Sequence, residues 1–380
     1  MKRKVYFYVR EQPVIYQDAI VVLADGLRQV GVDVFGSANY WRRSTSDEDW
    51  LVPAHPHVRP EHCDVVVVSD TWCKAIDASF RVHEAPLPAG LFAPARTYRT
   101  AYLDLADGYP TTSWQPAFAA FDVVLRAKFN RRCAHPPRHQ PWALGVSTRM
   151  LDATRHAPPW ETRRPNVLIN FGASHPYAHP ARTRLTKPFI DAVRPFMDVD
   201  ERRDDLSRPP ETPYDRLMWE QTQHRHHPDY FRRLNETRAI AAFCGDLIPP
   251  SPIRPRYLAG GRRARLQRRC YELLSRLDPR PLRLIQWDSW RFWEGLAAGC
   301  LVFNLDLSHY GVELPVMPRH LEHYVAVRPE TLTTVISELR GNPAQLARIA
   351  EQGRAWALEH YSPKALATRF LHLTLGSAGR

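Results

Sequence analysis

The segment from Gln286 to Asn304 reads QWDSWRFWEGLAAGCLVFN and is typical of a short loop, one helix, a glycine stop and a buried strand. Asp288 or Ser289 can cap the helix, because a side-chain oxygen there can accept hydrogen bonds from the first backbone N–H groups. The small residues of GLAAG allow close packing on a sheet, and Gly299 can end the helix. We therefore predict a helix whose N-terminus lies beside a strand end, where an anion can bind.

Two charged residues, Arg291 and Glu294, lie in the first turns of this predicted helix. Arg291 would add a full positive charge to the anion site. The Glu294 carboxylate can accept two hydroxyl groups at once, which suits the diol of a ribose or a hexose. A plain packing helix is the open alternative, because residues three apart also form surface ion pairs while Trp290, Trp293 and Leu296 fill a core.

Both halves of the chain alternate between strand and helix patterns. Apolar runs predict strands buried on both faces of parallel sheets. In the first half these runs are VYFYV (5–9), VDVFG (32–36), CDVVVVSD (63–70), RTAYLDLADG (99–108) and FDVVLRAKFN (121–130). After a proline-rich break they are NVLINFG (166–172), RAIAAFCG (238–245), LRLIQW (282–287), CLVFNLD (300–306) and HYVAV (323–327).

This alternation predicts an α/β fold with two doubly wound Rossmann-like domains facing each other across a cleft. We place the first domain at residues 1–150, a linker at 151–165 and the second domain at 166–355. Helical patterns connect the strands, among them ARTRLTKPFIDAV (181–193) and RRCYELLSRL (268–277). A C-terminal helix over residues 356–380 is expected to cross back to the first domain.

The motif DSWRFWEGLAAGCLVF (288–303) resembles the donor-binding signature S-x-R-F-x-E-x-x-A-x-G of GT-B glycosyltransferases of the family 1-like group. The segment from His320 to Phe370 resembles the closing segment of the same family. The resemblance covers about residues 284 to 370 well, the rest of the C-terminal half loosely and the N-terminal half only in architecture. It implies that Glu294 binds the ribose of a nucleotide sugar and that the helix N-terminus faces the sugar or the diphosphate.

One residue departs from the family pattern. Many members that retain the anomeric configuration carry E-x7-E, and Gln286 stands at the position of the first glutamate. The amide of Gln286 can bind sugar hydroxyls but carries no charge, so the sugar and the stereochemistry stay open, as does an inactive protein of this fold. Asp288 could supply a carboxylate nearby instead.

Further donor-binding residues are expected where the second domain begins. Gly172 and Ser174 follow a strand and allow a ligand to approach the backbone, and basic residues follow them on a predicted helix: Arg182, Arg184 and Lys187. The resemblance implies that basic residues of this region hold the diphosphate, whose charge must be stabilised as it leaves. A solvated basic helix is the alternative. A nucleotide-diphosphate sugar would be the co-substrate, and we expect no metal or other cofactor.

Three carboxylates are candidates for the general base that an inverting enzyme needs to take the acceptor proton. Asp70, Asp104 and Asp107 each follow a buried strand of the first domain, so each could point into the cleft. Carboxylates at strand ends also cap helices routinely.

The composition narrows the class of protein. The net charge of +12 would attract polyanions, and 44% hydrophobic residues exclude a disordered chain. No apolar run has the length of a membrane span, and six scattered cysteines predict a cytoplasmic protein. The basic surface would also suit peripheral contact with anionic lipid at the inner membrane face.

We therefore predict a bacterial, metal-independent, nucleotide-sugar-dependent glycosyltransferase whose acceptor is a glycan, a lipid-linked sugar or a small molecule. Another GT-B enzyme, such as a nucleotide-sugar epimerase, is the nearest alternative. A basic nucleic-acid-binding protein without enzymatic activity is a second alternative. We expect no nucleic-acid partner, because no helix-turn-helix, aromatic RNA-binding strand or zinc finger is recognisable.

Overall fold

A computed structural model describes most of the chain. The described residues are 2–10, 18–76, 82–84, 86–106, 112–171, 180–203, 205, 207–248 and 281–376. The predicted helix at 268–277 and the candidate residues Asp107, Gly172 and Ser174 lie outside them.

The first half forms a parallel sheet with the strand order β10–β9–β8–β5–β1–β2. Its strands are β1 (Lys4–Tyr8), β2 (Asp33–Gly36), β5 (Val65–Ser69), β8 (Arg99–Asp104), β9 (Val123–Arg126) and β10 (His139–Pro141). The helices are α1 (Asp18–Gln29) and α2 (Asp70–Cys73), with short 3-10 turns at Pro60–His62, Thr112–Trp114 and Pro116–Ala120. Two antiparallel ribbons pair β3 (Tyr40–Arg42) with β4 (Trp50–Val52) and β6 (Lys74–Ile76) with β7 (Val82–Glu84).

The second half forms another parallel sheet, with the order β12–β11–β13–β16–β17. Its strands are β11 (Arg164–Leu168), β12 (Asp198–Asp200), β13 (Thr237–Ala241), β16 (Leu301–Leu305) and β17 (Val325–Val327). The helices are α3 (Thr148–Thr154), α4 (Pro180–Val193), α5 (Pro213–Gln221), α6 (Pro228–Glu236), α8 (Trp290–Ala297), α9 (Leu332–Arg340), α10 (Pro343–Tyr361) and α11 (Pro363–Leu375), with a 3-10 turn at Trp160–Thr162.

The predicted α/β fold class is confirmed, with one local difference. The segment LRLIQW does form a strand, β15 (Arg283–Ile285), but it pairs antiparallel with β14 (Asp246–Ile248) outside the parallel sheet. The segment predicted as an irregular linker includes the end of α3, while the boundaries at residues 150 and 165 stay predictions. Among the described residues, no helix is both long and apolar enough to span a membrane.

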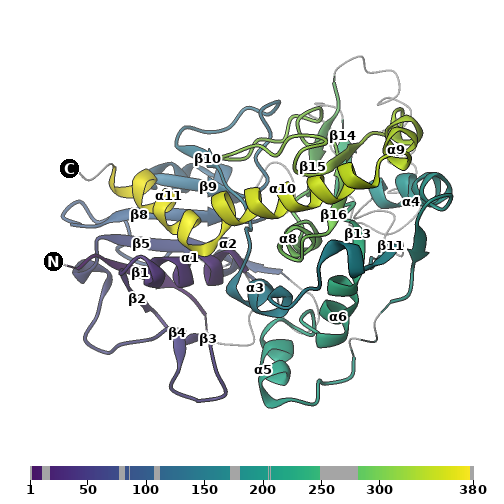
Figure 1. Ribbon diagram of the computed structural model, residues 1–380. Helices are drawn as coiled ribbons and strands as arrows, with labels where there is room; N and C mark the ends of the chain where they lie inside the picture. Colours follow the sequence, from purple (N-terminus) through teal and green to yellow (C-terminus); the bar gives the residue numbers. More distant parts are fainter. Residues whose placement is uncertain are drawn as a thin grey trace, which may run out of the picture.

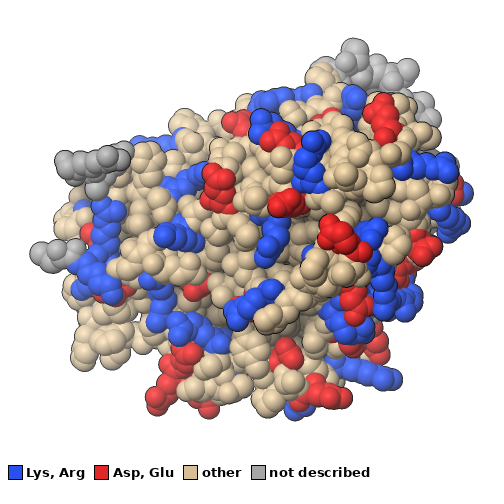
Figure 2. Space-filling view, in the orientation of Figure 1, with Lys and Arg blue, Asp and Glu red and all other residues tan. Residues whose placement is uncertain are grey.

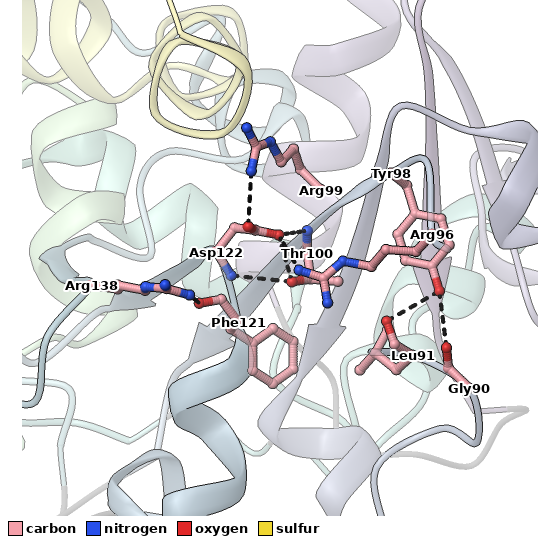
Figure 3. A network of polar contacts seen from close by, with 9 residues as sticks. All are labelled: Gly90, Leu91, Arg96, Tyr98, Arg99, Thr100, Phe121, Asp122 and Arg138. Atoms are coloured by element: carbon pink, nitrogen blue, oxygen red, sulfur yellow. Dashed lines mark hydrogen bonds and ion pairs between the residues drawn. The ribbon is translucent and has the colours of Figure 1, made fainter. Parts of the chain in front are cut away.

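A polar cluster connects the amino ends of β8 and β9 in the first sheet (Figure 3). The carboxylate of Asp122 accepts hydrogen bonds from the backbone N–H and the hydroxyl of Thr100, and it pairs with Arg96 and Arg99. Burial by itself raises the pKa of Asp122, but the bonds from Thr100 and the two guanidinium groups outweigh it and lower the pKa. The cluster lies at the edge of the sheet opposite the strand ends where ligands bind in α/β folds.

The two halves of the chain are packed together. In Figure 1 the yellow C-terminal helices run from the second sheet back to the first, where α11 lies on α1. Asn130, which follows β9, donates hydrogen bonds of 3.0 Å to the carbonyl oxygens of both Leu284 and Tyr310. In addition, one cluster of buried hydrophobic residues extends through both sheets.

The contact between α1 and α11 predicts a stability effect at Gly26. A Cβ atom at this position would lie 1.8 Å from the carbonyl oxygen of Pro363, so α11 would have to move. We expect Gly26→Ala to lower the free energy of unfolding by about 1–3 kcal/mol, measured by urea denaturation. Gly341→Ala is the control, because a Cβ there would meet no atom within 4 Å. Equal stability of the two variants would contradict the close packing.

Candidate functional site

The predicted helix α8 ends as the sequence indicates. Gly299 adopts a left-handed conformation with φ of 68°, and the N–H of Cys300 bonds to the carbonyl oxygen of Gly295, as in a Schellman motif. A Cβ at Gly295 would lie 2.5 Å from a methyl carbon of Ile240 and 3.0 Å from one of Val302. The prediction that small residues bring the helix close to the sheet is thus confirmed.

The predicted side-chain cap of α8 is wrong. Ser289 has the backbone conformation of an N-cap residue, but its hydroxyl does not bond to the helix. This hydroxyl is buried and has no hydrogen-bond partner among the described residues. Asp288 does not cap either, since its carboxylate accepts from the backbone N–H of Leu144 at 2.8 Å and from the indole of Trp293 at 2.6 Å. Asp288 therefore ties α8 to the segment between the sheets.

Two arginines meet at the carboxyl ends of β11 and β13, beside the start of α8. The Nε of Arg291 donates to the carbonyl oxygen of Asn170 at 2.7 Å. The Nε of Arg182, on α4, donates to the carbonyl oxygen of Phe243 at 2.9 Å, and its guanidinium lies 5.2 Å from the centre of the Phe171 ring. These bonds hold both guanidinium groups at the sheet edge.

Neither arginine forms an ion pair with a carboxylate of a described residue; both bind backbone carbonyls. Burial is the main cause that lowers the pKa of Arg182; the charge of Arg291 lowers it further, and Cys244 raises it. Arginine stays protonated at neutral pH even so. Two guanidinium groups without an ion-pair partner among the described residues, together with a helix N-terminus, make this edge suited to an anion.

The other basic residues of α4 lie differently. Arg184 is exposed, and Lys187 is exposed and forms a 2.7 Å ion pair with Asp191 one turn later. Of the basic residues predicted on this helix, the structure therefore brings only Arg182 next to Arg291. A donor-binding role for Arg184 and Lys187 stays a prediction.

Glu294 is 3% exposed and has partners that the sequence did not indicate. Its Oε2 accepts a 2.8 Å hydrogen bond from the hydroxyl of Tyr230, and its Oε1 lies 3.7 Å from Nη2 of Arg149. The alternative ion pair with Arg291 is not formed, because Arg291 points to Asn170. No local signal could have revealed Tyr230 or Arg149, since they lie 64 and 145 residues away along the chain.

Gln286 precedes α8 in a strained conformation. Its φ of 55° is left-handed, which is uncommon for a residue with a side chain. Gly245, with φ of 93°, packs against it so closely that a Cβ would lie 2.2 Å from the carbonyl oxygen of Ile285. Strained backbone conformations are concentrated at functional sites, so this geometry supports the predicted contact of Gln286 with the donor. The contact itself stays a prediction.

The carboxylates of the first domain differ in their surroundings. Asp104 is 1% exposed and pairs with Arg126 at 2.6 Å, and it also accepts a bond from the hydroxyl of Ser113. These are the contacts of a buried structural ion pair. Asp70 begins α2 directly after β5 and is 9% exposed. The described residues contain no group of three or more His, Cys, Asp or Glu arranged to hold a metal ion.

Solved structures share this architecture at very low sequence identity. An alpha-glucosyltransferase in complex with UDP is 8% identical, and the likeness covers 98% of this chain and 100% of that chain with a TM-score of 0.53. An alpha-glucosyltransferase in complex with UDP-glucose and DNA containing an abasic site is 9% identical over 98% of this chain and 99% of that chain, with a TM-score of 0.51. No protein-family model and no curated protein sequence matches the chain.

These likenesses establish the fold. The chain has the GT-B fold of two Rossmann-like domains, which confirms the fold expected from residues 288–303.

Proposed function

We propose that this protein is a glycosyltransferase that uses a UDP-sugar as its donor. The observation that carries the proposal is the edge of the second sheet, where Arg182 and Arg291 lie beside the start of α8 and neither forms an ion pair with a carboxylate of a described residue. A nucleoside diphosphate is an anion of the size and charge that such a site binds. UDP is proposed because it is bound by alpha-glucosyltransferases of this fold.

The proposed reaction forms one bond at the anomeric carbon of the sugar and breaks another. An acceptor oxygen bonds to the anomeric carbon of the sugar while the bond from that carbon to the diphosphate breaks. UDP leaves with the bonding electron pair, and the acceptor hydroxyl gives its proton to a base. Arg182, Arg291 and the first N–H groups of α8 would stabilise the charge on the leaving diphosphate. Asp70, which begins α2 directly after β5, is the described carboxylate that we propose first as the base, and Asp104, which pairs with Arg126, stays a second candidate.

The acceptor is proposed only by class. A glycan, a lipid-linked sugar or a small molecule suits the fold, and a cytoplasmic location with contact to anionic lipid remains part of the proposal. The expectation of no nucleic-acid partner is not supported, because alpha-glucosyltransferases of this fold have been solved in complex with DNA.

DNA is therefore a second candidate acceptor, favoured by the net charge of +12. Figure 2 shows basic side chains over both halves of the visible face, mixed with acidic ones. Incubation with radiolabelled UDP-glucose and either duplex DNA that carries a hydroxymethyluracil base, whose hydroxyl can accept a sugar, or a glycan and lipid extract separates the two candidates by which fraction becomes labelled. Free labelled sugar without a labelled acceptor would point to hydrolysis instead.

We expect UDP to bind the wild-type protein and to raise its melting temperature by mass action, because a ligand of the folded state alone shifts the unfolding equilibrium. Thermal-shift and calorimetric titrations with UDP, GDP, dTDP, ADP and CMP measure this. The same titrations with EDTA test metal independence, for which binding must persist. If no nucleotide binds at millimolar concentration, the proposed function is wrong.

A further inference from the structure

The partners of Glu294 point to a residue outside both sheets. Arg149 lies on α3, in the segment between β10 and β11, and is 3% exposed. Tyr230 and Arg149 are the side chains that contact the carboxylate of Glu294 within the described part of the chain. A carboxylate offers about four acceptor positions, of which the Tyr230 hydroxyl occupies one, while Arg149 at 3.7 Å is an ion-pair partner; acceptor positions therefore remain for a ligand.

Other contacts set the orientation of Arg149. Its Nη1 lies 3.1 Å from Nδ1 of His226, and since a guanidinium only donates, that ring nitrogen must accept. The hydrogen of the neutral imidazole is then on Nε2, which lies 3.9 Å from Oδ1 of Asp215. The guanidinium carbon lies 5.7 Å from the ring centre of Phe231 and 5.6 Å from that of Trp290. Charge and aromatic faces therefore hold the group on several sides.

Arg149 also contacts the first turn of α8. Trp290 and Glu294 are four residues apart and lie on the same face of α8. Arg149 contacts both, so it spans the first turn of the helix whose N-terminus carries Ser289. Arg291 points from a different face of α8 to Asn170. Arg149 and Arg291 therefore approach α8 from different sides.

We propose that Arg149 is a positioning residue for the donor: it fixes the Glu294 carboxylate in the orientation that accepts the ribose hydroxyls. The inference rests on the proposed function, with Glu294 as the ribose ligand that the resemblance of residues 288–303 implies. It extends that function because it makes the segment between the two sheets part of the donor site. Arg149 acts through Glu294 and is not expected to contact the diphosphate.

Titrations with uridine and with UDP test the inference, since uridine has the ribose but no phosphate. We expect Arg149→Met to weaken both ligands by about tenfold, in equal proportion. Added to Glu294→Gln, the same change should cause no further loss, because its effect passes through the carboxylate. Arg149→Lys, which keeps the charge but not the fork geometry, should give an intermediate loss. Arg155→Met is the control, because Arg155 is the C-cap residue of the same helix, is exposed and pairs with Asp152.

The outcomes separate the two proposals. A wild-type protein that does not bind UDP overturns the proposed function, and this inference with it. Normal wild-type binding together with unchanged binding by Arg149→Met overturns the inference alone. So does an Arg149→Met loss that adds in full to that of Glu294→Gln, or that affects UDP and not uridine. If Arg149→Met does not fold, as judged by circular dichroism, unchanged uridine affinity of the folded Arg149→Lys variant overturns the inference.

Discussion

Replacing Arg182 or Arg291 by methionine should weaken UDP binding by roughly 10- to 150-fold, because a hydrogen bond to a charged group contributes about 1.5–3 kcal/mol. Both guanidinium groups lie at the carboxyl edge of the second sheet, and neither has a carboxylate partner among the described residues that could be left unpaired. Methionine keeps much of the side-chain volume, so the loss reports the charge. Uridine, which has no phosphate, should bind both variants nearly as well as the wild type. Calorimetry with the two ligands measures the difference.

Arg184→Met provides a matched control on the same helix. Arg184 is two residues from Arg182 but exposed, so Arg184→Met measures what an exposed basic residue of this helix contributes, and we expect a much smaller loss of UDP affinity than from Arg182→Met. If Arg184→Met weakened UDP as much as Arg182→Met, long-range charge rather than the site would explain the effect. If Arg182→Met and Arg291→Met both bound UDP normally, the diphosphate site would have to be sought elsewhere.

Replacing Asp104 by asparagine should lower the free energy of unfolding by about 3–5 kcal/mol, because removal of one partner leaves the other charge buried and uncompensated. Asp104 and Arg126 are each 1% exposed, and their 2.6 Å contact joins β8 to β9. Asparagine has nearly the same shape as aspartate, so packing is preserved and the charge is tested. Urea denaturation with the linear extrapolation measures the change.

The double variant Asp104→Leu with Arg126→Met distinguishes lost charge balance from lost packing. Removal of both charges should restore part of the stability, because no unpaired ion is then left in the core.

The single variant Asp104→Asn also tests whether Asp104 is catalytic. If its unfolding free energy is unchanged but its transfer activity is lost, Asp104 is the base in place of Asp70.

Much of the fold could be predicted because its determinants are local. The run CDVVVVSD predicts a strand buried on both faces, and β5 is buried throughout between two parallel neighbours. Strand β15 was misplaced in the parallel sheet because its apolar run has no feature that separates a parallel from an antiparallel neighbour. The side-chain cap of α8 was predicted wrongly because Asp288 finds better donors in Leu144 and Trp293, which only the folded chain brings near.

By itself the sequence determined the alternation of strands and helices, the close approach of α8 to the sheet at Gly295 and its end at Gly299. These features depend on periodicity and on backbone conformations that a residue shares with its immediate neighbours. Only the tertiary structure decided which charges meet: Arg182 with Arg291 beside α8, Glu294 with Arg149, and Asp104 with Arg126. Pairing across tens of residues depends on how strands and helices pack, and burial then makes a partner obligatory for each carboxylate. The sequence therefore indicates that α8 is the helix proposed to bind the UDP-sugar, and the fold determines which side chains of α8 a UDP-sugar could reach.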